Sequence, residues 1–219
     1  MWRIILTDEL LRLEDIGCLN GRGLPLVEHV SFVLNTGSIL WVTGPAGSGK
    51  TTLLEVIIKE RRLDLGKLSF HQQPLWGRGC IKRSQLRRQI GVIFQEDYLL
   101  AEHTVFENAA AALQLTGCSR SVLRDRTYQA LAEVGLTAKA EQGVHLLSSS
   151  EKRLLSLARV LAKMAPLVIA DLNTCEVDQE VIAPRLENLA SYGCGILIFS
   201  KQRSQAIPKA PVTAELMLR

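Results

Sequence analysis

The sequence predicts an α/β protein, built on a doubly wound parallel sheet that an all-helical segment interrupts. Four short apolar runs are typical of strands buried on both faces of such a sheet: residues 38–43, 90–94, 167–170 and 195–199. Between Thr104 and Leu136, in contrast, apolar residues recur at helical spacing. A chain of 219 residues is long enough to form one well-buried domain of this kind.

The N-terminal part predicts an antiparallel β subdomain. Residues 11–16 and 29–34 alternate in polarity, as strands with one exposed face do, and the turn sequence 20–23 separates them. We therefore expect a single domain over residues 1–219. Residues 1–95 and 150–219 form its core together with the β subdomain, and residues 96–149 form an inserted helical subdomain.

The remaining elements follow from local patterns. Residues 67–71 predict one further short strand. Apolar positions with a period of three to four residues predict helices at residues 51–58, 150–164 and 181–190, and two more within 104–136 that are separated at 117–119. Residues 81–89, just before the buried strand 90–94, predict a short polar helix.

The loop between the strand 38–43 and the helix 51–58 is the segment that indicates function most clearly. It matches the pattern G-x-x-x-x-G-K-[ST] with Gly44, Pro45, Ala46, Gly47, Ser48, Gly49, Lys50 and Thr51. Glycine lets successive N–H groups point inward at phosphate oxygens. The helix N-terminus, which includes Thr52, adds partial positive charge. The pattern therefore predicts a phosphate-binding loop, with an ordinary glycine-rich turn as the alternative.

Two parts of this site are expected to hold a magnesium-bound triphosphate. Lys50 would reach the β- and γ-phosphates, and the Thr51 hydroxyl would bind Mg²⁺. Asp171 directly follows the apolar run 167–170, at the edge of the sheet where ligands collect. Its carboxylate would hold Mg²⁺ through water, unless it only caps a helix.

Composition limits the classes of partner. The net charge is +4, and the basic residues are scattered without an arm or block, so no nucleic-acid partner is expected. One basic cluster stands out, at Lys82, Arg83, Arg87 and Arg88. We interpret it as a solvated helix face, with a contact to acidic lipid or to a partner as the alternative.

The cysteines and the hydropathy of the chain argue against further classes of protein. The five cysteines are widely spaced and odd in number, which predicts neither a zinc site nor a disulfide framework. No apolar run reaches the roughly 18 residues that a membrane-spanning helix needs. The N-terminus, with Arg3 before a short apolar patch, does not resemble a secretory signal.

Over residues 10–203 the chain resembles an ABC-type ATP-binding subunit. The motifs that carry the resemblance, in the order and spacing of that superfamily, are the loop 44–51, FQED at 94–97, LSSSEKRLLSLARVLA at 147–162 and LVIAD at 167–171. Residues 86–100, 104–110 and 130–136 are most similar to the FtsE type of cell-division ATP-binding protein. The lipoprotein-release and macrolide-export ATPases are near relatives. The resemblance implies a P-loop NTPase core of RecA type, with an antiparallel β subdomain and an inserted helical subdomain.

The resemblance also implies roles for individual residues, with ATP and Mg²⁺ as cofactors. Gln95 matches the glutamine that reaches Mg²⁺ and the attacking water. Ser148 matches the signature serine, which caps the γ-phosphate on the opposing subunit of a head-to-tail dimer, and Asp178 matches an aspartate at the dimer seam. Residues 98–100 match the surface where a membrane partner docks, with core packing as the alternative.

Four features of the family pattern are replaced in this chain. Leu172 stands where a glutamate polarises water, and Lys201 stands where a histidine contacts the γ-phosphate. Serines at 149 and 150 replace the two signature glycines, although Ser150 could instead be a plain N-cap. By the least certain alignment, Asn20 replaces the aromatic residue that stacks on adenine. Asn173 and Cys175 also differ from the usual Pro-Thr-Gly, whereas Thr174 agrees with it. Gln95 and Lys201 are left as the candidates for catalysis.

By the resemblance, the retained Lys50, Thr51, Gln95 and Asp171 bind triphosphate and Mg²⁺, and the replaced glutamate and histidine serve hydrolysis. The resemblance thus favours the ATP-binding subunit of an FtsE/FtsX-like complex in cell division, at the cytoplasmic face of the bacterial inner membrane, with weak or absent hydrolysis. Its partners would be an FtsX-like or permease subunit and a second ATP-binding chain, itself or another. An active ABC transporter ATPase completed by its partner subunit stays open, as does a small P-loop kinase or a nucleotide-free scaffold.

Overall fold

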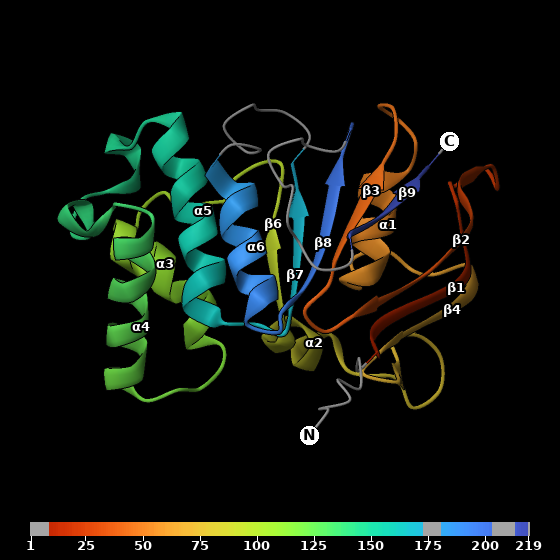
Figure 1. The fold of residues 1–219 in the computed structure, drawn as a ribbon, viewed down its shortest axis with the longest axis horizontal. Coiled ribbons are helices and arrows are strands. Elements are labelled where there is room, and N and C mark those ends of the chain that lie inside the picture. Colours follow the sequence, from red (N-terminus) through yellow and green to blue (C-terminus); the bar gives the residue numbers. More distant parts are fainter. Residues whose placement is uncertain (1–8, 173–180, 203–212, 219) are drawn as a thin grey trace, which may run out of the picture.

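The computed structural model describes residues 9–172, 181–202 and 213–218. Two sheets form its framework (Figure 1). The larger is parallel, with strand order β6-β7-β8-β3-β9. Its strands are β3 (Ile39–Thr43), β6 (Ile90–Ile93), β7 (Leu167–Asp171), β8 (Gly195–Ser200) and β9 (Thr213–Met217). The predicted fold class is confirmed, because all four apolar runs form neighbouring strands of this sheet.

The second sheet is the expected β subdomain. Its strands pair antiparallel in the order β2-β1-β4-β5. They are β1 (Glu9–Leu19), β2 (Pro25–Asn35), β4 (Leu65–Phe70) and β5 (Gln73–Pro74). The first two are longer than the sequence predicts, because bulges let β1 continue pairing with β2 through irregular register.

Six α-helices and two short 3₁₀ helices occupy the described residues. The α-helices are α1 (Lys50–Ile57), α2 (Arg83–Gln89), α3 (Val105–Gln114), α4 (Arg120–Glu133), α5 (Ser149–Lys163) and α6 (Ala183–Ser191). The 3₁₀ helices are η1 (Thr137–Lys139) and η2 (Val144–Leu146). All the α-helices lie where the sequence predicts them, within one to three residues at each end.

The parallel sheet separates two hydrophobic cores. Side chains alternate between the faces of a strand, so Trp41 and Ile198 join the core under α5 and α6, whereas Val42 and Phe199 join the core under α1 and the antiparallel sheet. Figure 1 shows this layering, with α3 and α4 stacked outside α5. Helix α5 therefore contacts the sheet on one side and the helical insert on the other.

This layering places the functional elements at one edge. Strands β3, β7 and β8 run parallel, so the loop after β3, Asp171 at the end of β7 and Lys201 after β8 meet at the carboxyl edge of the sheet. The expected dimer residue Asp178 and the departures at 173–175 lie outside the described residues.

Candidate functional site: a phosphate-binding loop

The loop between β3 and α1 has the backbone geometry of an anion cradle. Gly47 and Gly49 have φ values of 82° and 86°, in the left-handed region that favours glycine. A Cβ on Gly49 would lie 2.4 Å from the carbonyl oxygen of Leu26, whereas one on Gly47 would meet no atom within 4 Å. Gly49 is thus required for close packing beneath the loop, and Gly47 borders open space.

Lys50 is held inside the loop by its own carbonyl groups. Its Nζ donates hydrogen bonds of 2.7 Å to the carbonyl oxygens of both Gly44 and Pro45, and of 3.1 Å to Ser48 Oγ. The side chain is only 6% exposed. Burial lowers the pKa of the Lys50 amine. Asp171 opposes this shift, and the positive charge of Lys201 adds to it.

A pocket of about 520 Å³ opens over this loop. Its walls gather residues from the loop, β2, the segment after β6 and the segment after β8: Leu26, Ala46, Gly47, Gly49, Lys50, Thr51, Thr52, Gln95 and Lys201. None of these lining side chains is acidic, and two carry an ammonium group. An anion is therefore the kind of ligand that this pocket suits.

Asp171 lines an adjoining pocket of about 550 Å³, and Thr51 and Gln95 line both pockets. The structure thus brings together the three residues predicted to bind metal. Hydroxyl, amide and carboxylate oxygens are hard ligands of the kind that Mg²⁺ prefers, and a few of them with water and phosphate suffice for it. Within the described residues no three His, Cys, Asp or Glu side chains cluster as a metal site. The residues present fit a Mg²⁺ ion that shares its coordination with phosphates.

Arg153, which the sequence analysis does not single out, joins these parts. From α5 its Nη1 donates to the carbonyl oxygen of Phe94, just before Gln95, and approaches Asp97 Oδ1 at 3.4 Å. Its Nη2 donates to the main-chain carbonyl of Asp171 at 2.9 Å. The buried guanidinium therefore fixes the segment of Gln95 and the end of β7 relative to each other. The S-x-x-E start of α5 predicts a helix there, but not which distant carbonyls its arginine meets.

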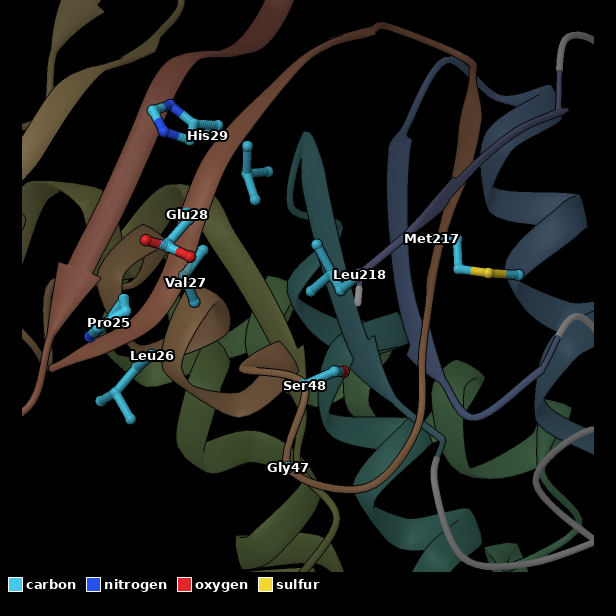
Figure 2. A pocket seen from close by; sticks show the side chains of 10 residues that line it. Pro25, Leu26, Val27, Glu28, His29, Gly47, Ser48, Met217 and Leu218 are labelled. Carbon is cyan, nitrogen blue, oxygen red and sulfur yellow. The ribbon is translucent and has the colours of Figure 1, made fainter.

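A third pocket, of about 450 Å³, lies beside the loop on the side of β2 and the C-terminal end of the chain. Figure 2 shows Pro25–His29 along one wall, Gly47 and Ser48 below, and Leu218 directed toward β2. Gly47 lines this pocket and the pocket over the loop, as does Leu26, so the two cavities are neighbours. A ligand whose phosphates occupy the loop could extend its remaining atoms in this direction.

Comparison with known proteins assigns the family. The model of the ABC transporter family matches residues 27–174. The cell division ATP-binding protein FtsE of Bacillus subtilis is 30% identical over 195 residues, which cover 86% of this chain and 84% of FtsE.

The chain belongs to the ABC transporter family, as an ATP-binding subunit.

Other matches agree with this assignment. The methionine import ATP-binding protein MetN of Chromohalobacter salexigens is 33% identical over 183 residues, covering 82% of this chain and 53% of MetN. A solved dimeric bacterial ABC transporter cassette superposes with a TM-score of 0.75 at 20% identity, over 88% of each chain. The structural match supports the fold of the ATP-binding subunit.

In this ABC subunit, Leu172 has its side chain in the hydrophobic core. It is 1% exposed and packs in the core under α5 and α6. Its N–H donates a hydrogen bond of 2.9 Å to the carbonyl oxygen of Phe199 on β8, which extends the β7–β8 pairing by one residue. Leucine offers no group that could accept a proton or orient water.

Lys201 lies in the bend after β8, where Ser200 Oγ donates a hydrogen bond of 2.7 Å to the carbonyl oxygen of Gln202. Its exposed side chain lines the pocket over the loop together with Lys50. The position predicted for the switch residue of the ABC family therefore reaches the phosphate pocket, and it contributes a positive charge there.

The signature segment caps its own helix. Ser148, not Ser150, is the N-cap of α5: its Oγ accepts a hydrogen bond of 3.2 Å from the N–H of Glu151. The Glu151 carboxylate accepts from the Ser148 N–H at 3.0 Å and also from Lys139 Nζ. The bond from Lys139, followed by that from Ser148, lowers the pKa of Glu151. The serines at 148–150 are all exposed, so the segment is accessible to another chain.

The structure also shows where the predicted docking run 98–100 and the predicted adenine-contacting position Asn20 lie. Tyr98 and Leu100 are 64% and 43% exposed, whereas Leu99 packs against the core, so the run 98–100 is split between surface and interior. Asn20 does not present a flat face to a ligand, because its Oδ1 accepts hydrogen bonds from the N–H groups of Arg22 and Leu24. Its side chain stabilises the β1–β2 turn.

Proposed function

We propose that this chain is the ATP-binding subunit of an FtsE/FtsX-like complex, which binds Mg-ATP at the cytoplasmic face of the bacterial inner membrane and hydrolyses it slowly or not at all. The observation that carries the proposal is the burial of Leu172 beside an otherwise intact phosphate pocket. A general base contributes about 10²–10⁴ to rate, and the residue directly after Asp171 is Leu172, which has no carboxylate to supply it.

In this proposal the chain's own residues bind and orient the nucleotide. The loop N–H groups and Lys50 would hold the β- and γ-phosphates, with Gly44, Gly47 and Gly49 shaping the loop. Lys50 would exchange its bonds to the loop carbonyls for bonds to phosphate. Thr51, Gln95 and Asp171 would hold Mg²⁺, which supplies charge neutralisation when it is bound.

The position of Gln95 supports coupling between the bound nucleotide and the helical subdomain. It lines the phosphate pocket and the adjoining pocket, whose wall also carries Tyr98. We assign residues 1–95 and 150–219 to the core and residues 96–149 to a helical subdomain that responds to the ligand at Gln95. ATP would then act by differential affinity for two arrangements of these parts, with little need for hydrolysis.

The FtsE assignment is supported by the share of each relative's length that this chain matches. FtsE of Bacillus subtilis is matched over 84% of its length, and FtsE of Escherichia coli K12 over 76% at 32% identity. The MetN match covers 53% of that longer protein. No helix among the described residues is long and apolar enough to cross a bilayer. In this proposal an FtsX-like subunit that docks near Tyr98 provides the membrane association, and the exposed signature segment faces a second ATP-binding chain.

An active transporter ATPase completed by a partner subunit is the second candidate. The exposed serines at 148–150 favour it, because they could serve a competent site on a different, fully equipped chain. Co-purification of a second ATP-binding chain in equal amount would support this candidate.

Phosphate release tests the proposal. The purified chain is compared with a Leu172→Glu, Lys201→His double variant, and the proposal expects the variant to turn over at least about tenfold faster. Leu172 is buried, so a glutamate there can cost stability; a Leu172→Gln, Lys201→His variant controls for that cost without adding a base. Fast turnover by the unmodified chain would refute slow hydrolysis, and absence of ATP binding would refute both candidates.

A further inference from the structure

The phosphate pocket contains two lysines from different elements and no carboxylate among its lining residues. Lys50 comes from the start of α1, and Lys201 from the bend after β8. Their charges are close enough that Lys201 contributes to lowering the pKa of Lys50. Asp171 is the acidic group that acts on Lys50 from the adjoining pocket. Two ammonium groups facing one cavity repel each other until an anion lies between them.

Lys201 can act on a ligand without first breaking a structural contact. Lys50 is buried and bonded to Gly44, Pro45 and Ser48, whereas the Lys201 side chain is exposed at the rim of the same cavity. A lysine ammonium is a compact point charge on a long, flexible stem. Its reach suits a terminal phosphate, which lies farthest from the rest of a nucleotide.

The pocket over the loop offers no aromatic platform for a base. The nine residues that line the pocket over the loop include no ring. In the neighbouring pocket of Figure 2 the aromatic ring is that of His29, whose Nδ1 lies 2.7 Å from Asp15 Oδ1 at an exposed position. Asn20 is engaged in its own turn. Base stacking, worth about 1–3 kcal/mol per base where proteins use it, has no partner among the nine residues that line the pocket over the loop.

We propose that Lys201 is a second phosphate ligand, which with Lys50 makes this site select nucleotides by the number of their phosphates and not by their base. The inference rests on the proposed function, because it concerns the same site. It adds that a nucleoside triphosphate of either purine is accepted, and that the distinction between triphosphate and diphosphate depends on Lys201.

Calorimetric titration in the presence of Mg²⁺ tests this inference. The ligands are ATP, GTP, ADP and inorganic tripolyphosphate, and the proteins are the unmodified chain, Lys201→Met, Lys201→Arg and Lys67→Met. Lys67 is an exposed lysine of β4 that lines none of the pockets around the loop, and its variant is the matched control.

We expect ATP and GTP to bind the unmodified chain with affinities within about threefold, and ADP to bind at least about tenfold more weakly. Tripolyphosphate should compete with ATP. Lys201→Met should weaken ATP about tenfold and ADP less than about twofold, Lys201→Arg should restore most of the loss, and Lys67→Met should change neither.

Equal losses for ATP and ADP in Lys201→Met, or a preference for ATP over GTP above about tenfold, would overturn the inference while leaving the proposed function intact. If the unmodified chain bound none of the four ligands, the inference and the proposed function would both fail.

Discussion

Arg153 Nη2 lies 2.9 Å from the main-chain oxygen of Asp171 and donates a hydrogen bond to it. This contact joins the helix that begins at the signature segment to the strand that ends at the predicted Mg²⁺ ligand. The same guanidinium also donates to the carbonyl oxygen of Phe94, the residue before Gln95. One buried side chain thus connects the signature helix, the end of β7 and the segment of Gln95.

Replacement of Arg153 should therefore cost both stability and ligand binding. Arg153→Met leaves the Phe94 and Asp171 carbonyl groups without this donor inside the protein, which should lower the free energy of unfolding by about 2–4 kcal/mol. ATP affinity should fall as well, because Gln95 and Asp171 lose their relative positions. Urea unfolding and calorimetric titration measure the two effects. Arg62→Met, at an exposed position, is the control and should change the unfolding free energy by less than about 0.5 kcal/mol. A stable Arg153→Met variant with unchanged ATP affinity would contradict this role.

Because Lys163 is buried, we expect the free energy of unfolding to depend on pH in an unusual way. Its Nζ, at the end of α5, donates to the carbonyl oxygens of Arg87 and, at 2.6 Å, of Ile90. Burial lowers the pKa of Lys163 to about 8. A lowered pKa means that the folded state holds the proton more weakly than the unfolded state. The unfolded chain therefore binds more protons between pH 8 and the ordinary lysine pKa of 10.5, and stability rises with pH in that window.

Comparison with Lys163→Met isolates this contribution. The unfolding free energy of the unmodified chain should gain about 1–3 kcal/mol relative to the variant between pH 8 and pH 10.5. Below about pH 7 the difference between the two proteins should be constant. The neutral amine keeps two N–H groups for the two carbonyls, so the bonds survive deprotonation. Denaturant unfolding at several pH values measures the difference; a difference that stays flat or falls with pH would show that burial does not lower the pKa of Lys163.

In the proposed complex, Tyr98 should contribute to binding of the membrane subunit and not to binding of the nucleotide. Its ring lies edge-on to that of Phe94, with centroids 5.3 Å apart, and the side chain is 64% exposed beside the pocket that Gln95 shares. Exposed aromatic residues in such positions often dominate an interface. Tyr98→Ala should weaken binding to an FtsX-like subunit by about tenfold or more, with ATP affinity unchanged. Pull-down with the detergent-solubilised membrane subunit is the measurement. Tyr192→Ala, at an 87% exposed tyrosine after α6, is the control, and equal losses in the two variants would contradict a specific docking surface.

Local patterns account for most of the fold. Strands β3, β6, β7 and β8 are continuously apolar because helices or a second sheet cover both of their faces, so their sequences predict buried strands directly. The sequence does not predict strand β9. It is a short edge strand near the end of the chain, and its pairing to β3 joins residues far apart in sequence. Strand β5 has only two residues and depends on β4 for its pairing.

The sequence predicts the part of the site whose residues lie within a single motif. The loop from Gly44 to Thr51 can be found from sequence, because backbone geometry and charge must occur at fixed spacing. The contacts of Arg153 cannot be predicted, because its partner Phe94 is 59 residues away in sequence and an arginine in a helix is compatible with many partners. The burial of Leu172 and the shared pocket of Lys50 and Lys201 likewise depend on packing between distant segments.

A single-turnover experiment shows whether the chain binds Mg-ATP and leaves it intact. The chain, in excess over Mg-ATP labelled on the γ-phosphate, is incubated at neutral pH, and the bound nucleotide is recovered and identified over time. A Lys50→Met variant measures background. We predict that the unmodified chain retains label that Lys50→Met does not, and that the retained nucleotide is still ATP after about an hour, against the turnover of seconds or less that is typical of enzymes. Rapid recovery of ADP and free phosphate, or retention no greater than that of Lys50→Met, would contradict it.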